Sequence, residues 1–148
     1  MIKMKNAMLV PLLLASCLSH GYGPYDAKDL RVIDGDTIKL TVELWPGLSQ
    51  RISVRLSGVN TAETRRTKLK CEKVAGLAAK KYVQDLIVGA DITVDDIRIG
   101  KFAGRVLGDI KIDGVSLTDE LIRTGHGRFY DGGKRGDWCI DKLTGEIK

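Results

Sequence analysis

The fold is decided by the stretch Asp34-Gly35-Asp36-Thr37-Ile38-Lys39-Leu40-Thr41-Val42-Glu43-Leu44. From Ile38 to Leu44, apolar residues alternate with polar ones, as a strand with one buried face requires. Asp34-Gly35 is a tight-turn pair, and a short strand is expected over residues 30–33 before it. The stretch therefore predicts two antiparallel strands joined by a turn.

A third strand and a helix are expected next along the chain. Trp45-Pro46-Gly47 interrupts the alternation, which resumes over residues 52–56 with Arg55 on the face away from the core. Between residues 71 and 88, apolar side chains recur at three- and four-residue spacing, which predicts one amphipathic helix ended by Gly89.

The second half of the chain predicts two more strands and a short helix. Residues 92–94 and 106–112 are typical of strands, and Asp113-Gly114 of the turn that follows. Ser116 is expected to cap a helix that stops at Gly125. Five short strands with a helix between the third and fourth predict an α+β fold, a five-stranded Greek-key barrel of the OB type.

The length of the chain allows one such domain. The 148 residues, of which 43% are hydrophobic, suit a single core. We expect residues 22–148 to form this domain and residues 1–21 to be a signal peptide, because Lys3 and Lys5 precede the apolar run 7–14. That run is shorter than the roughly 20 residues that a membrane-spanning helix needs.

Two cleavage sites remain open for this leader. Leu14-Ala15-Ser16-Cys17 resembles a lipobox, which would leave a lipid anchor on Cys17, whereas Ser19-His20-Gly21 suits ordinary cleavage. Either way, we expect an exported protein, periplasmic or extracellular, that is soluble or lipid-tethered, monomeric and without a transmembrane segment.

The charge and the cysteines fit this expectation. The formal net charge is +5, and removal of residues 1–17 still leaves 22 basic against 19 acidic residues, which suits a polyanionic partner without identifying one. Cys71 and Cys139 remain as a pair that an oxidising compartment would join in a disulfide. Two separate buried thiols are the alternative.

Three kinds of group needed to hydrolyse a phosphodiester are present. The reaction needs a base to orient water, cations to spread charge over the phosphoryl oxygens, and usually a bound metal ion. The turn 34–37 offers oxygen ligands, Arg55 ends a strand, the loop 60–63 carries Glu63, and Arg105 opens a later strand.

These residues lie in three motifs that, in this order, resemble those of the thermonuclease (staphylococcal nuclease-like) family. The motifs are Val32-Ile33-Asp34-Gly35-Asp36-Thr37, then Val54-Arg55-Leu56-Ser57-Gly58-Val59-Asn60-Thr61-Ala62-Glu63, and Gly104-Arg105. Each motif alone has little specificity, but together they cover about residues 30–130. The resemblance implies a calcium-dependent endonuclease that cuts DNA and RNA with little sequence specificity and leaves 3′-phosphates.

The resemblance also implies roles for individual residues. Glu63 would be the general base, and Arg55 and Arg105 would neutralise the phosphate in its transition state. Asp36 would be the anionic calcium ligand, with Thr61 contributing its backbone carbonyl.

The chain departs from the family pattern at the metal site. Asn60 stands where an aspartate is usual, and hard cations prefer carboxylates, so we expect weaker calcium binding or use of magnesium or another divalent cation.

The nucleic-acid contacts are less clearly marked. The base-stacking tyrosines of the family do not align cleanly, which leaves Phe102 and Tyr130 as candidates. Lys134 and Arg135, in the glycine-rich tail, are candidates for phosphate contacts.

Two other functions remain possible from the sequence. One is a catalytically weak or silent OB module that binds nucleic acid or protein, and the other is an exported, disulfide-stapled interaction protein. The presence of Arg55, Glu63 and Arg105 favours the nuclease, and we expect no stable protein partner.

Overall fold

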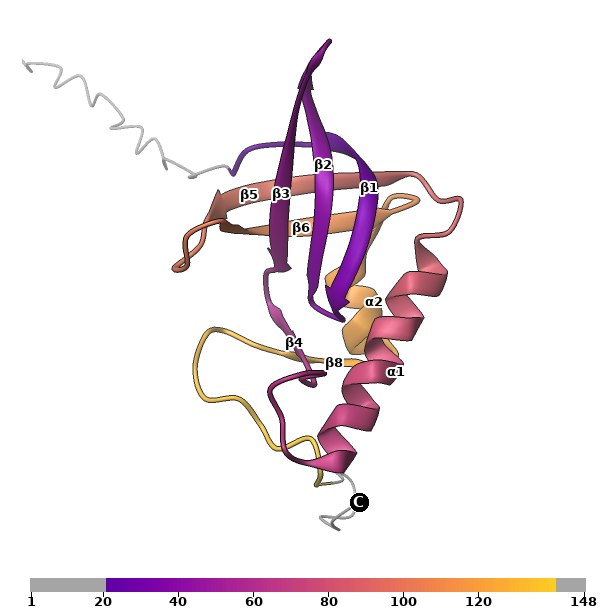
Figure 1. Cartoon of the computed structure of the whole chain (residues 1–148), viewed down its shortest axis with the longest axis vertical. Coiled ribbons are helices and arrows are strands. Elements are labelled where there is room, and N and C mark those ends of the chain that lie inside the picture. The colour runs from indigo at the N-terminus through magenta and orange to yellow at the C-terminus, as the bar shows by residue number, and fades with distance from the viewer. Residues whose placement is uncertain (1–20, 141–148) are drawn as a thin grey trace, which may run out of the picture.

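A computed structural model describes residues 21–140, so residues 1–20 of the expected signal peptide, with Cys17, lie outside them. Five strands close into the expected barrel (Figure 1). They are β1 (Tyr25–Asp34), β2 (Thr37–Trp45), β3 (Leu48–Leu56), β5 (Ile92–Ile99) and β6 (Arg105–Ile112). Antiparallel pairs join β3, β2, β1, β5 and β6 in that order, and a parallel pairing of β6 with β3 closes the barrel.

The alternation that predicted β2 has the expected cause. Ile38, Leu40 and Val42 are at most 2% exposed, whereas Lys39 and Glu43 between and beyond them face solvent. These apolar side chains meet those of the other strands and of both helices in one core. Its buried members are Val32, Ile38, Leu40, Val42, Val54, Leu56, Val59, Val83, Ile92, Val94, Ile110, Ile112, Leu117 and Leu121.

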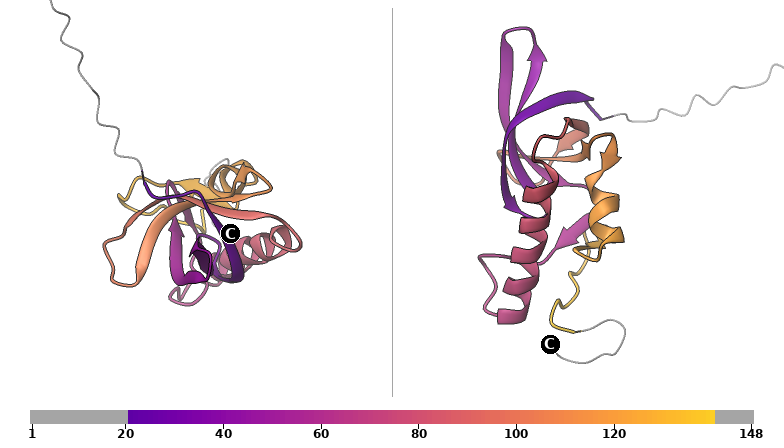
Figure 2. Two further views of the ribbon diagram at one scale, coloured as in Figure 1. Left: turned by 90° about the horizontal axis from the view of Figure 1, so that it is seen from above. Right: turned by 90° about the vertical axis from the view of Figure 1, so that its right-hand side faces the viewer.

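The strands are longer than the sequence predicted. β1 begins at Tyr25 rather than at residue 30, and β2 and β3 continue to a turn at residues 46–47. Figures 1 and 2 show this hairpin extending beyond the barrel, where Trp45 and Leu48 are exposed. The extra length has little apolar alternation, so its pairing comes from the backbone ladder rather than from burial.

The predicted helix is α1 (Lys70–Leu86), which runs along the side of the barrel (Figure 1). Its buried face includes Ala79 and Val83, two of the apolar residues at helical spacing, together with Gly76, whereas Ala78 is exposed. A Cβ atom on Gly76 would lie 2.7 Å from the carbonyl oxygen of Ala62. The helix therefore packs directly on the loop after β4, a contact that only glycine permits.

Three short strands were not predicted. β4 (Val59–Thr61) pairs with β8 (Gly127–Phe129) in a separate two-stranded ladder, and β7 (Val115–Ser116) pairs antiparallel with the end of β6. Strands of two or three residues carry too little alternation to be recognised. The second helix, α2 (Leu117–Arg123), begins as predicted, with the Ser116 hydroxyl accepting the Asp119 N–H.

The tail after β8 returns to the start of α1. Cys139 is buried and forms a disulfide with Cys71, with 5.4 Å between the two Cα atoms. The Arg128 guanidinium also covers the Trp138 ring, 4.1 Å from its centroid. Among the helices of residues 21–140, none has the length and apolar character required to cross a bilayer.

Candidate active site

A cleft of about 900 Å³ opens where β3 and β6 run in parallel. Arg105 pairs with Ser53 and Leu107 with Arg55, so Arg55 and Arg105 lie two positions apart on neighbouring strands. Because side chains alternate between faces along a strand, both arginines project from the same face. The cleft is lined by Ile33, Asp34, Thr37, Lys39, Ser53, Arg55, Glu63, Arg65, Arg66, Phe102, Ala103, Gly104, Arg105 and Arg135.

Arg55 is held by a buried carboxylate. Its side chain is 12% exposed and its Nη1 atom donates to Asp36 Oδ1 over 2.5 Å, while Nη2 donates to Asn60 Oδ1 over 3.1 Å. Although it points away from the barrel core as expected, Arg55 is therefore not a free surface group. The two bonds orient the guanidinium and leave its remaining donors available to a ligand.

Asp36 connects the β1–β2 turn to the rest of the site. Besides Arg55, its carboxylate accepts the Thr37 hydroxyl over 3.0 Å and the Thr61 backbone N–H over 2.8 Å. Its own carbonyl accepts the Leu56 N–H over 2.9 Å. The turn requires glycine at position 35, because a Cβ atom there would lie 2.9 Å from side-chain atoms of both Ala79 and Thr61. The turn 34–37 is thus packed between α1 and β4.

The three residues expected to hold a cation lie together beneath the cleft. Asp36, Asn60 and Thr61 are at most 5% exposed, and the Thr61 hydroxyl is buried with no hydrogen-bond partner among the described residues. All of their donors are oxygens, which suits a hard divalent cation.

The charge of this set is low, because Asp36 is its only carboxylate and is already paired with Arg55. Within residues 21–140, no three His, Cys, Asp or Glu side chains gather in a metal-binding arrangement. The donors therefore fit a cation that keeps several water ligands.

Glu63 lies in the loop between β4 and α1, and α1 fixes its backbone. A Cβ atom on Gly76 would lie 2.8 Å from the Glu63 carbonyl oxygen, so the helix and the loop are in direct contact. The Glu63 side chain is 30% exposed, and its Oε1 atom accepts Nη1 of Arg135 over 2.5 Å. The tail is thus held at two points: the disulfide joins it to α1, and this ion pair joins it to the loop that borders the cleft.

Arg105 contacts an aromatic ring at the other wall of the cleft. Its guanidinium carbon lies 4.9 Å from the centroid of the Phe102 ring, which is 66% exposed. An exposed ring beside a cation can stack a base while the guanidinium contacts the adjoining phosphate.

Two of the expected nucleic-acid residues lie elsewhere. Tyr130 donates its hydroxyl to the Gly133 carbonyl over 3.0 Å and stabilises the tail. Lys134 lines a separate hollow beside Trp138. Neither is among the residues that line the cleft.

Sequence reasoning missed three basic residues of the cleft. Lys39 projects from β2, and Arg65 and Arg66 follow Glu63 in the loop; all three are exposed. Their signals were the basic pair Arg65-Arg66, one residue after the second motif, and the polar position of Lys39 in the alternation of β2.

One comparison identifies a family, over a range that includes the second and third motifs. A protein-family model described as "Staphylococcal nuclease homologue" matches residues 53–140, which is more than half of the chain. None of the curated proteins compared with the chain matches it.

Proposed function

The chain belongs to the staphylococcal nuclease homologue family, and we propose that it is a metal-dependent endonuclease acting on DNA and RNA. The observation that carries this proposal is the convergence of Arg55, Arg105 and Glu63 on one cleft. A carboxylate beside two guanidiniums supplies both the base and the cations that phosphodiester hydrolysis needs.

In the proposed reaction, Glu63 accepts a proton from the attacking water. The water oxygen bonds to phosphorus and the bond from phosphorus to the 5′-oxygen breaks. The 5′-oxygen takes a proton from solvent water, which leaves a 3′-phosphate and a 5′-hydroxyl. Because Arg135 donates to Oε1 of Glu63, either Oε2 accepts the water proton or this pair opens first.

Arg55 and Arg105 contact the non-bridging oxygens of the phosphate. Their charge stabilises the negative charge that grows on those oxygens in the transition state. Asp36 and Asn60 orient Arg55 before substrate arrives, so its side chain loses less conformational freedom when the transition state forms.

A divalent cation would be held by Asp36, Asn60 and Thr61. When bound, it would polarise the phosphoryl oxygen and add positive charge to the site. The all-oxygen donor set supports calcium or magnesium, and the single carboxylate supports weak binding.

The proposed substrate is a nucleic-acid backbone rather than a sequence. Guanidinium contacts to phosphate carry no base information, and the exposed ring of Phe102 offers a stacking surface that suits every base. Single strands and frayed duplex ends expose such bases.

The proposed place of action is outside the cytoplasm. The Cys71–Cys139 disulfide is compatible with an oxidising compartment, and the leader expected over residues 1–21 would direct export there. A lipid anchor on Cys17 remains part of this proposal.

The test compares cleavage of single-stranded DNA and RNA by the purified mature protein with calcium, with magnesium and with chelator. Glu63→Gln and Arg105→Ala are the test variants. Glu43→Gln and Arg51→Ala are matched controls, because both residues are exposed on the barrel and do not line the cleft.

We expect cation-dependent cleavage that falls at least a hundredfold in the test variants and persists in the controls. Binding without cleavage in every protein would favour the silent OB module. Equal cleavage by wild type and both test variants would place the activity at another site.

A further inference from the structure

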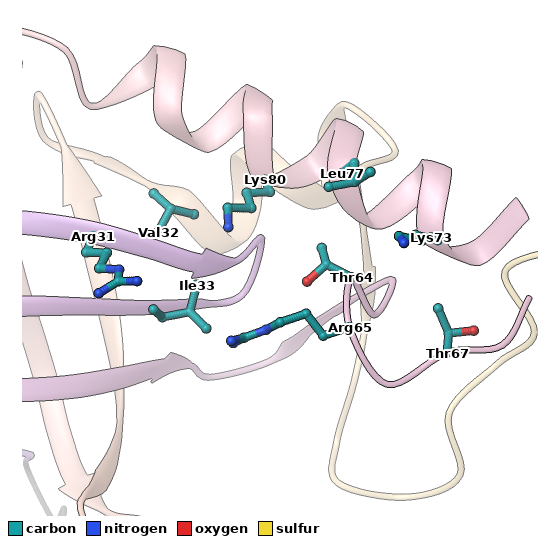
Figure 3. Close-up of a pocket in the computed structure, with 9 residues that line it drawn as sticks. All are labelled: Arg31, Val32, Ile33, Thr64, Arg65, Thr67, Lys73, Leu77 and Lys80. Atoms are coloured by element: carbon teal, nitrogen blue, oxygen red, sulfur yellow. The ribbon is translucent and has the colours of Figure 1, made fainter. Parts of the chain in front are cut away.

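A second hollow of about 420 Å³ adjoins the cleft between β1, α1 and the loop after β4 (Figure 3). The two share Ile33 and Arg65, so they lie next to each other. The hollow is lined by Arg31, Val32, Ile33, Thr64, Arg65, Thr67, Lys73, Leu77 and Lys80. The proposed cleavage reaction does not use it.

The charge of this hollow is of one sign. Four of its residues, Arg31, Arg65, Lys73 and Lys80, are basic, and no acidic residue lines it. Within the described part of the chain, none of the four forms an ion pair, whereas Lys81, only one position after Lys80, pairs with Asp85. Cations left unpaired around a concave surface attract an anion.

The positions of these cations are set by regular elements. Lys73 and Lys80 are seven residues apart on α1 and therefore lie on one face of the helix. Arg31 projects from β1, and Figure 3 shows the basic side chains reaching the hollow from these different elements. The distribution suits an extended anion rather than a single compact one.

The walls of the hollow also offer a hydroxyl donor. Thr67 Oγ1 accepts the Leu69 N–H over 3.1 Å, which leaves its hydroxyl hydrogen for another acceptor. Thr64 is committed to Asp34 and fixes the wall instead. A phosphate oxygen is an acceptor that suits both the ammonium groups and this hydroxyl.

We propose that this hollow is a backbone subsite that binds successive phosphates of the same nucleic-acid strand beyond the scissile bond. The inference rests on the proposed function of the neighbouring cleft. Arg65 borders both spaces and would contact the strand as it passes from one to the other. The subsite would make the protein bind long strands more tightly than dinucleotides.

The test is binding rather than cleavage. A double variant, Lys73→Gln with Lys80→Gln, removes two charges from the hollow and keeps good helix formers in α1. Lys70→Gln with Lys81→Gln removes the same charge from the same helix outside the hollow and is the control. Dissociation constants for a single-stranded DNA 20-mer and a dinucleotide are measured in chelator over a range of salt concentrations.

We expect the hollow variant to weaken 20-mer binding severalfold and to leave dinucleotide binding unchanged. Its salt dependence should fall by about 1.4 in the slope of log K against log salt, which is about 0.7 for each lost phosphate contact. The control variant should show a markedly smaller loss of 20-mer affinity. Two results would overturn the subsite. One is an equal loss of 20-mer affinity in the hollow variant and the control, and the other is an equal loss of affinity for the 20-mer and the dinucleotide in the hollow variant.

This result is independent of catalysis. If the wild type cleaves nothing but binds the 20-mer through Lys73 and Lys80, the proposed nuclease activity fails and the backbone subsite stands. If it cleaves and the two variants bind alike, the nuclease stands and the subsite fails.

Discussion

The guanidinium of Arg135 donates to the carboxylate of Glu63 over 2.5 Å, joining the tail to the loop that carries the proposed general base. The two residues are 72 positions apart, and neither motif order nor spacing predicts the contact. The carboxylate that should accept a proton from water is thus engaged by a side chain of the same molecule.

Removal of this contact should raise activity on short substrates. In Arg135→Ala, both carboxylate oxygens of Glu63 become available to the attacking water. We expect kcat on a dinucleotide to rise about two- to fivefold, which corresponds to a part-exposed pair worth about 0.5–1 kcal/mol. The control is Lys134→Ala, which removes the neighbouring charge. A fall in kcat in Arg135→Ala alone would show instead that Arg135 serves the reaction.

The contact between α1 and the Glu63 loop should be sensitive to one methyl group. In Gly76→Ala, the new Cβ would meet the carbonyl oxygens of Ala62 and Glu63 at 2.7 and 2.8 Å, so the loop or the helix must move. We expect a loss of about 1–3 kcal/mol in the free energy of unfolding and a fall in kcat of about tenfold or more. Urea unfolding and cleavage assays below the unfolding transition measure the two effects separately. An unchanged kcat would mean that the shift does not reach Glu63.

A carboxylate at position 60 should strengthen cation binding. Asn60 is buried beside Asp36, so Asn60→Asp places two negative charges close together and lowers stability when no cation is present. We expect the melting temperature without cation to fall, its increase on addition of calcium to exceed that of wild type, and less calcium to be needed for half-maximal cleavage. Asn60→Gln, which lengthens the amide without adding charge, is the control. Identical calcium responses in wild type and Asn60→Asp would contradict the charge explanation.

Loss of the disulfide should destabilise the domain and release the tail. The Cys71–Cys139 bridge spans 68 positions, and chain entropy assigns a loop of this size about 4 kcal/mol. We expect Cys71→Ser with Cys139→Ser to lower the free energy of unfolding by an amount of that order. Because the tail carries Arg135, the same variant should also show the increase in kcat predicted for Arg135→Ala. Full stability of the double variant under the same conditions would argue against a stabilising bridge.

The packing of α1 on α2 should weaken in acid. Hydrogen bonds from Arg123 and then Tyr82 lower the pKa of Glu120 from 4.5 to about 2. A lowered pKa in the folded state means that the contribution to stability is complete above pH 4.5 and is lost as the pH falls towards 2. Glu120→Gln should therefore lose less stability than wild type between these values. Parallel stability curves for the two proteins, from urea unfolding at each pH, would contradict this role.

The sequence was sufficient for the barrel because its strands alternate strongly. Ile38, Leu40 and Val42 identify a buried face, and Ser116 marks the start of α2 by ordinary capping chemistry. The β4–β8 ladder was missed because three-residue strands have no usable period. Its partner segments are also remote in sequence, so only the closed fold brings them together.

The candidate site was predicted in part for similar reasons. Motif order identified Arg55, Glu63 and Arg105, which line one cleft. The Asp36–Arg55 and Glu63–Arg135 pairs depend on side-chain directions in three dimensions, which linear spacing does not contain. For the same reason Tyr130 was a candidate from its residue type although its hydroxyl is bound to the tail.

The parallel pairing of β3 with β6 has a consequence for the cell that makes this protein. Arg55 and Arg105 become neighbours only when the barrel closes, because α1 and β5 lie between them in the chain. Pairings between distant segments require the whole intervening chain to be ordered. If the cleft is a nuclease site and the protein is exported, a polypeptide still unfolded in a secretion channel cannot cleave the DNA and RNA of the cell that makes it. Closure of the barrel after translocation would then bring the two arginines together and make the enzyme active.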